Sequence, residues 1–317
     1  MRFITRLVAD YYLRKPDQAA LLQIKYPNLS FLWAALLNEF SFLAGLNRGF
    51  RLTALNVELT NRCNLSCKPC LRNQHRPRRE CDMSFDTFRA IVDQVPDLQT
   101  LLPFQWGEPL LSPILYDCIA YARNRGARVM LTSNGTLLDE EASHRLLESG
   151  LTRLTVSFDG GRELQAQRRD VDPERIIANM KRFKQIRDDQ GAECALDVSM
   201  VVDKETLPHM EEFQRLFNGF ADRLQFIPRL MQGLRTKPCR ELWRGVLVVL
   251  SDGNATLCCA DHLGVAAIGN VRDSSPVEIF NSAAMKRIRS THRAGEFQGI
   301  CKTCAEFDAP GVSPRFS

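Results

Sequence analysis

Three cysteines stand close together in the first third of the chain, directly after an apolar run at residues 55–59. They are Cys63, Cys67 and Cys70, and thiolates this close in sequence can converge on one small inorganic body. Four thiolates would close a zinc site or fully ligate an iron–sulfur cluster, whereas three leave one iron of a four-iron cluster open to a small-molecule ligand. The spacing therefore predicts a [4Fe–4S] cluster with one catalytic iron.

Two alternative interpretations of these cysteines are a zinc site with Cys81 or His75 as fourth ligand, and three unrelated buried thiols. The position after a strand, in the loop that leads to a helix, favours the cluster because α/β enzymes place their chemistry there. The pattern Cys-x3-Cys-x2-Cys resembles the signature of the radical S-adenosylmethionine (SAM) superfamily. That resemblance implies that the open iron chelates S-adenosyl-L-methionine.

Composition sets limits on the class of protein. The chain has 317 residues, of which 44% are hydrophobic and 25% charged, which is enough for one large domain and a small one. A net charge of only +5, spread along the chain, gives no reason to expect a nucleic-acid partner. Eleven cysteines without a visible signal peptide indicate a reducing compartment, so we expect a cytoplasmic protein.

The middle of the chain alternates short apolar runs with longer amphipathic stretches. Strands are predicted at 55–60, 101–105, 128–132, 153–158, 195–201 and 223–227, and helices at 85–95, 114–125, 140–149, 173–189 and 207–217. Six such units predict an α/β fold, a partial (β/α)6 TIM-like barrel that binds at the carboxyl ends of its strands. We divide the chain into an N-terminal helical segment (1–50), the barrel (51–230), a small C-terminal domain (231–308) and a tail (309–317).

The N-terminal segment is very apolar at residues 30–46 but is shorter than the roughly 20 residues that a bilayer span requires. It is predicted to pack on the flank of the domain. The alternative is a peripheral membrane contact through residues 30–46, flanked by arginines and lysines.

Short polar motifs follow the next three predicted strands. Alone, each is ordinary turn chemistry, but their order resembles that of the SAM-binding motifs of the superfamily. The first resembles Gly-Gly-Glu-Pro, with Trp106 in place of the first glycine. The resemblance implies SAM contacts from Gly107, Glu108, Pro109, Ser133, Asn134, Ser157 and Asp159, and from either Arg168 or Arg169, with a slight preference for Arg168.

The C-terminal region holds a second group of cysteines, around a predicted β-hairpin at 246–258 and a helix at 276–289. The pattern resembles the Twitch or SPASM extension that carries an auxiliary [4Fe–4S] cluster. The ligands that this resemblance implies are Cys239, Cys258, Cys301 and Cys304. A zinc ribbon is the alternative, because four cysteines also suit tetrahedral zinc, and Cys259 is the alternative to Cys258.

The resemblance implies a radical SAM oxidoreductase that cleaves SAM to a 5′-deoxyadenosyl radical and removes hydrogen from an unactivated carbon. A single auxiliary cluster is similar to that of the dehydrogenases of aminocyclitol biosynthesis, so we expect a small-molecule substrate, a polyol, sugar or aminosugar whose alcohol is oxidised. The alternatives are an epimerase with Cys259 or Cys81 as hydrogen donor, a peptide maturase, and a non-catalytic electron carrier. A flavodoxin- or ferredoxin-type protein is the expected reductant.

Overall fold

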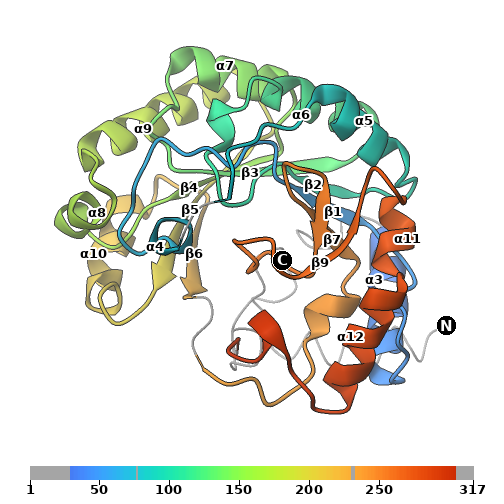
Figure 1. Ribbon diagram of the computed structural model, residues 1–317. Coiled ribbons are helices and arrows are strands. Elements are labelled where there is room, and N and C mark those ends of the chain that lie inside the picture. The colour runs from blue at the N-terminus through green and yellow to red at the C-terminus, as the bar shows by residue number, and fades with distance from the viewer. Residues whose placement is uncertain (1–28, 76–77, 230–232, 305–317) are drawn as a thin grey trace.

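The computed structural model describes residues 29–75, 78–229 and 233–304. Nine strands form one sheet in the order β6-β5-β4-β3-β2-β1-β7-β8-β9. The first six strands, all mutually parallel, are β1 (Ala54–Val57), β2 (Thr100–Leu102), β3 (Arg128–Ser133), β4 (Arg153–Ser157), β5 (Ala195–Val202) and β6 (Arg223–Pro228). The sheet curves without closing, which confirms the predicted partial barrel (Figure 1).

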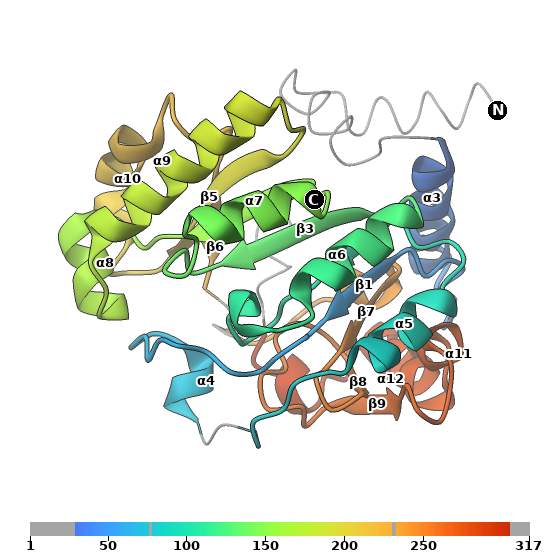
Figure 2. The same cartoon turned by 90° about the horizontal axis from the view of Figure 1, so that it is seen from above.

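Helices between the strands cover the outside of this curve (Figures 1 and 2). They are α5 (Phe85–Asp93), α6 (Leu115–Asn124), α7 (Glu140–Glu148), α9 (Pro173–Gln190) and α10 (Met210–Phe217). Their apolar faces pack on strand residues such as Leu55, Leu101 and Leu154, all fully buried. Local signals set their starts, because Ser84 and Asp139 each accept a hydrogen bond from a backbone N–H of the first turn.

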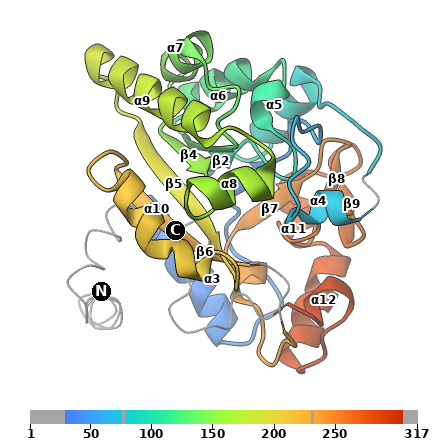
Figure 3. The same ribbon diagram turned by 90° about the vertical axis from the view of Figure 1, so that its left-hand side faces the viewer.

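Two further helices lie where only loops were predicted. Helix α4 (Leu71–Gln74) follows the third cysteine, and α8 (Arg162–Arg169) lies between β4 and α9, as Figure 3 shows. The sequence of α8 is almost wholly polar, so it lacks the apolar stripe by which a helix is recognised. The predicted helix at 207–217 begins as a short 3₁₀ turn, Leu207–His209, that continues into α10.

The C-terminal region continues the barrel sheet. Strand β7 (Val246–Val249) pairs in parallel with β1, and β8 (Asn254–Thr256) and β9 (Ala267–Asn270) follow antiparallel. The hairpin was predicted, but β9 and the pairing to β1 were not.

The prediction of a single helix at 276–289 was wrong. It is two helices, α11 (Pro276–Phe280) and α12 (Ala283–Arg293). Ser282 caps the second, and the amide of Asn281 between them exchanges two hydrogen bonds with the backbone of Gly49, which holds the chain out of helical geometry.

In the N-terminal segment, α3 (Leu29–Leu43) is helical as predicted and packs beside the 3₁₀ turn Arg240–Trp243, where the rings of Phe42 and Trp243 meet edge to face. Residues 1–28 and the predicted tail lie outside the described residues. Within the described part of the chain, no helix is both long enough and apolar enough to cross a membrane.

Candidate active site

The loop with the three cysteines leaves the carboxyl end of β1 and ends at α4, where Cys70 is the N-cap residue. All three thiols are half-buried, and the amide of Lys68 donates to the carbonyl of Arg168 on α8 at 2.9 Å. Burial raises the pKa of Cys63 and of Cys67, and the charge of Cys70 acts on both in the same direction. The Cys63 and Cys67 thiols therefore lie close enough to Cys70 to respond to its charge.

Gly107 packs directly on the start of this loop. A Cβ atom at this position would lie 2.3 Å from the carbonyl oxygen of Thr60 and 2.7 Å from that of Arg62. The next amide, that of Glu108, donates to the same Arg62 oxygen at 2.7 Å. Only glycine fits such a close approach of two backbones, so the loop after β2 and the cysteine loop are held together here.

Glu108 is buried, with 2% of its surface exposed. Its carboxylate accepts hydrogen bonds from the Ser133 hydroxyl and the Asn134 amide, both at 2.8 Å, and from the Leu110 amide at 3.1 Å. Pro109 is the first residue of the short 3₁₀ turn that Glu108 caps. Burial raises the pKa of Glu108 despite these donors. The motifs after β2 and β3 thus meet at one buried carboxylate.

Asn64, which was not singled out from the sequence, joins the cysteine loop to the same place. Its side-chain oxygen accepts from the Asn134 amide group at 2.9 Å, and its own amide group donates to the Thr136 hydroxyl at 2.9 Å. Asn64 is one of the unspecified residues between the first two cysteines, so the spacing of the motif carries no signal for it.

The motif after β4 lies beside the cysteine loop through two arginines of α8. Asp159 is buried, and the Nε atom of Arg169 is 3.0 Å from its carboxylate. Burial raises the pKa of Cys67, and the positive charge of Arg169 is the largest influence that opposes this. Ser157, half-buried at the end of β4, lies opposite Ser199 of β5.

Arg168, the arginine preferred from the sequence, has different partners. It forms ion pairs with Asp203 at 2.8 Å and with Glu205, and lies 3.5 Å from Asp159. Its guanidinium is thus surrounded by carboxylates. Of the two arginines, Arg169 is the one whose charge lowers the pKa of Cys67, and the charges of Cys67 and Cys70 in turn help to raise the pKa of Arg169.

The second group of cysteines comes together from three segments. The charges of Cys239 and Cys301 both act on Cys258, and that of Cys304 acts on Cys301. Burial raises the pKa of Cys301 to about 11 and that of Cys258 well above its usual value. The Arg235 guanidinium donates to the sulfur of Cys304 at 3.5 Å.

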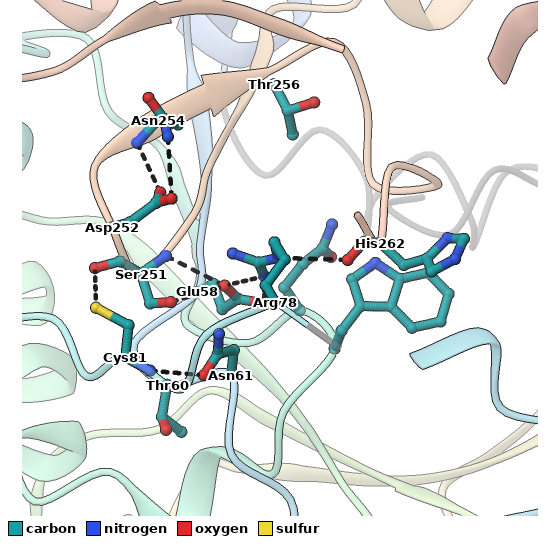
Figure 4. Close-up of polar contacts among 12 residues, drawn as sticks. Glu58, Thr60, Asn61, Arg78, Cys81, Ser251, Asp252, Asn254, Thr256 and His262 are labelled. Carbon is teal, nitrogen blue, oxygen red and sulfur yellow. Dashed lines mark hydrogen bonds and ion pairs between the residues drawn. The ribbon is translucent and has the colours of Figure 1, made fainter. Parts of the chain in front are cut away.

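The two thiols predicted as hydrogen donors lie near the C-terminal hairpin. Cys259 is buried, and its neighbours include Val248 and Leu250. Cys81 is half-buried, with its sulfur 3.4 Å from the carbonyl oxygen of Ser251 (Figure 4).

Two protein-family models match this chain. Residues 57–217 match the model of the radical SAM superfamily, and residues 239–305 match SPASM, an iron–sulfur cluster-binding domain. The chain belongs to the radical SAM superfamily.

Individual relatives of this radical SAM protein differ in what they are named for. An AdoMet-dependent heme synthase of Nitratidesulfovibrio vulgaris is 36% identical over 104 residues, 32% of this chain and 28% of the relative. A PqqA peptide cyclase of Gluconobacter oxydans is 33% identical over 116 residues, 36% of this chain and 32% of the relative. The chain thus spans about a third of the length of these curated relatives.

Solved structures share the fold at low identity. Streptococcus suis SuiB bound to its precursor peptide SuiA superposes with a TM-score of 0.60 at 15% identity, over 90% of this chain and 80% of SuiB. Native anSMEcpe with bound AdoMet gives 0.59 at 19%, over 74% and 82%. BtrN in complex with AdoMet and 2-DOIA gives 0.50 at 18%, over 78% and 89%.

The residues of this radical SAM chain fit two iron–sulfur clusters. Among the residues that the structure describes, no three Cys, His, Asp or Glu side chains lie close enough together to hold a single metal ion. A four-iron cluster holds its thiolates further apart than one ion does, because each binds a different iron. Two separate groups, each made only of thiols, are the donor sets that such clusters use. Binding of iron would supply the positive charge that these buried and half-buried thiolates need.

Proposed function

We propose that this chain reductively cleaves SAM and uses the resulting radical to oxidise a substrate carbon. The observation that carries the proposal is the position of Glu108, where the loops after β1, β2 and β3 meet. Its buried carboxylate accepts from Ser133 and Asn134, and its backbone amide donates to Arg62. Burial raises the pKa of this carboxylate, and a bound cation would stabilise its charged form. In this proposal the cation is the ammonium group of SAM.

Each motif has a role in this proposal. Cys63, Cys67 and Cys70 would hold the SAM-binding cluster, and Glu108 with the Gly107 and Pro109 backbone would hold the methionyl ammonium. Ser133, Asn134 and Ser157 would contact the ribose and carboxylate. For the carboxylate we favour Arg169 over Arg168, because Arg168 already pairs with Asp203 and Glu205. Asp159 orients Arg169.

The second group, Cys239, Cys258, Cys301 and Cys304, would hold one auxiliary cluster. We favour Cys258 over Cys259 because Cys258 stands at Gly-x4-Cys spacing from Gly253. When bound, the two clusters would supply one electron to SAM and accept one electron from the substrate radical. Oxidation of an alcohol then balances: one hydrogen atom leaves the carbon to form 5′-deoxyadenosine, and one electron and the hydroxyl proton leave to form the ketone.

We propose a small polyol, sugar or aminosugar as substrate. BtrN, which shares the fold, was solved with the small molecule 2-DOIA. A peptide is the second candidate, because PqqA peptide cyclase and peptide-bound SuiB are among the similar proteins. The epimerase alternative needs a thiol that gives up a hydrogen atom to the substrate radical. Its two candidates are Cys259, which lies in an apolar cluster, and Cys81, which contacts a backbone carbonyl.

Two partners belong to the proposal. The cysteine loop is half-exposed, which would allow a flavodoxin- or ferredoxin-type reductant to approach. On α3, the exposed side chains of Trp33, Phe40 and Leu43 with nearby Arg48 would suit a peripheral membrane contact.

The test is an anaerobic preparation, reconstituted with iron and sulfide, in which iron and zinc are measured together with dithionite-driven formation of 5′-deoxyadenosine from SAM. About eight iron per chain with deoxyadenosine formed would match two four-iron clusters. Four iron with one zinc would remove the electron-accepting role of the C-terminal site. A fully loaded first cluster without deoxyadenosine would contradict the proposal and favour an electron carrier.

A further inference from the structure

Two side chains from the loop after β2 bind one carbonyl oxygen in the loop between β8 and β9. The Gln105 amide group donates to the carbonyl of Cys259 at 3.0 Å, and the Trp106 indole N–H donates to the same oxygen at 3.1 Å. A carbonyl oxygen has two lone pairs, so both bonds are satisfied at once. Cys258, a member of the second cysteine group, immediately precedes this carbonyl in the chain.

The segment 251–262, which contains this carbonyl, is held at two more points. Glu58, fully buried after β1, accepts from Arg78 at 2.7 Å and from the amide and hydroxyl of Ser251 at 3.1 and 3.0 Å (Figure 4). Arg78 also donates to the carbonyl of His262 at 3.3 Å. Ser251 and His262 bracket Cys258, so the segment is fixed on both sides of that cysteine.

Packing leaves little freedom between the loop after β2 and the loop between β8 and β9. The ring centroids of Trp106 and His262 are 5.4 Å apart in an edge-to-face arrangement. The cavity that remains between them, lined also by Asn61 and Arg72, has a volume of about 10 Å³. That is room for about one water molecule, so the loops cannot slide past each other without breaking these contacts.

We propose that Gln105 and Trp106 are positioning residues that couple the SAM site to the auxiliary cluster site. Trp106 stands two residues before Glu108, and Gly107 between them is packed against the Thr60 and Arg62 carbonyls. A movement of Glu108 on SAM binding therefore reaches the Cys259 carbonyl through a short and tightly packed segment. The proposal rests on the proposed function. It assigns a structural role to Trp106, which stands where the Gly-Gly-Glu-Pro motif has its first glycine.

The experiment is hydrogen–deuterium exchange of the iron-loaded protein, with and without SAM. Trp106→Phe keeps the aromatic ring and removes the donor, and Gln105→Leu removes the second donor. A buried hydrogen bond contributes about 1 kcal/mol, so each change should raise amide exchange across residues 255–262 by roughly fivefold. SAM should slow exchange there in the wild type and should do so much less in Trp106→Phe.

The matched control is Trp243→Phe, which removes an indole N–H that donates to the carbonyl of Leu46 at 2.8 Å, beside α3. It should leave the exchange of residues 255–262 and its response to SAM unchanged. A redox titration followed by electron paramagnetic resonance should also show a changed midpoint potential of the auxiliary cluster in Trp106→Phe.

Exchange across 255–262 that is the same in Trp106→Phe as in the wild type, or a response to SAM that survives the change, would overturn the coupling. Failure of the proposed function would give another result, the absence of deoxyadenosine. A protein that forms no deoxyadenosine can still bind SAM and show slower exchange at residues 255–262.

Discussion

The side chains of Asn64 and Asn134 are joined by a hydrogen bond of 2.9 Å between the cysteine loop and the end of β3. Through it, the loop that would hold the cluster is attached to the segment that would hold SAM. Thr136 completes the connection, because it accepts from Asn64 and donates to Asn134 at 2.6 Å. The relative position of the cluster site and the SAM site thus depends on the side chain of Asn64, to which we assign no contact with either ligand.

Replacing Asn64 tests this connection. Asn64→Leu removes two hydrogen bonds of about 1 kcal/mol each, so the dissociation constant for SAM should rise by at least tenfold. Asn64→Asp keeps the oxygen that accepts from Asn134 and should have a smaller effect. Calorimetric titration of the reconstituted protein with SAM measures both, and Asn124→Leu at the exposed end of α6 is the control. An unchanged affinity in Asn64→Leu would contradict the role.

Gly107→Ala should disrupt both the fold of this region and SAM binding. The new methyl group would lie 2.3 Å from the backbone oxygen of Thr60, which cannot move without displacing the cysteine loop. Overpacking of this kind costs about 1–3 kcal/mol of stability, measurable by denaturant unfolding. Gly161→Ala is the control, because the atoms nearest to its methyl group would belong to the carboxylate of Glu212, at the end of a flexible side chain. Equal loss in both variants would argue against the close backbone approach.

The two neighbouring arginines of α8 should behave differently. Arg169→Lys should raise the dissociation constant for SAM more than tenfold, because a lysine cannot form the paired hydrogen bonds to a carboxylate that we propose for Arg169. Arg168→Met should instead lower stability by about 1–3 kcal/mol, because the largely buried carboxylate of Asp203 loses its shortest ion pair and keeps Arg229 at 3.2 Å. Thermal unfolding and SAM titration of both variants distinguish the roles. The reverse pattern would assign the carboxylate contact to Arg168.

Acid should destabilise the protein partly through Asp203. Burial opposes its ionisation, but the hydrogen bonds from Arg168 and from the amide of Thr206 outweigh burial and lower its pKa. A carboxyl whose pKa is lower in the folded state stabilises the fold above its unfolded pKa of about 3.9. This contribution disappears as the pH falls below that value.

Urea unfolding of the metal-free protein between pH 6 and pH 3 measures this contribution. Asp203→Asn should be less stable than the wild type at pH 6, and the two curves should converge toward pH 3. Parallel curves over the whole range would contradict the assignment.

Much of the barrel was predictable because its signals are local. Apolar runs such as residues 55–59 mark buried parallel strands, and Ser84 and Asp139 mark helix starts whatever lies around them. Helix α8 was missed because its buried residues, Gln165 and Arg168, are polar and pack through hydrogen bonds and ion pairs that only the tertiary structure provides.

In the site, residue types were predictable and their partners were not. Cysteine spacing and the Gly-Glu-Pro tripeptide are visible along the chain, because each motif lies within a few residues. Asn64, the choice of Arg169 near the cysteine loop and the Trp106 contact to Cys259 all join segments far apart in sequence. A single sequence does not show which of several polar residues meet across a sheet.

The parallel pairing of β7 with β1 has a consequence for the order in which the protein is made. Ala54 pairs with Val246, which is 192 positions further along the chain. During translation, β1 therefore emerges from the ribosome long before one of its two neighbours exists, and one row of its backbone hydrogen-bonding groups stays unpaired until the last quarter of the chain appears. An unpaired edge of this kind is a template for association with other chains. The nascent protein thus depends on its C-terminal cluster-binding region to complete the first strand of its barrel.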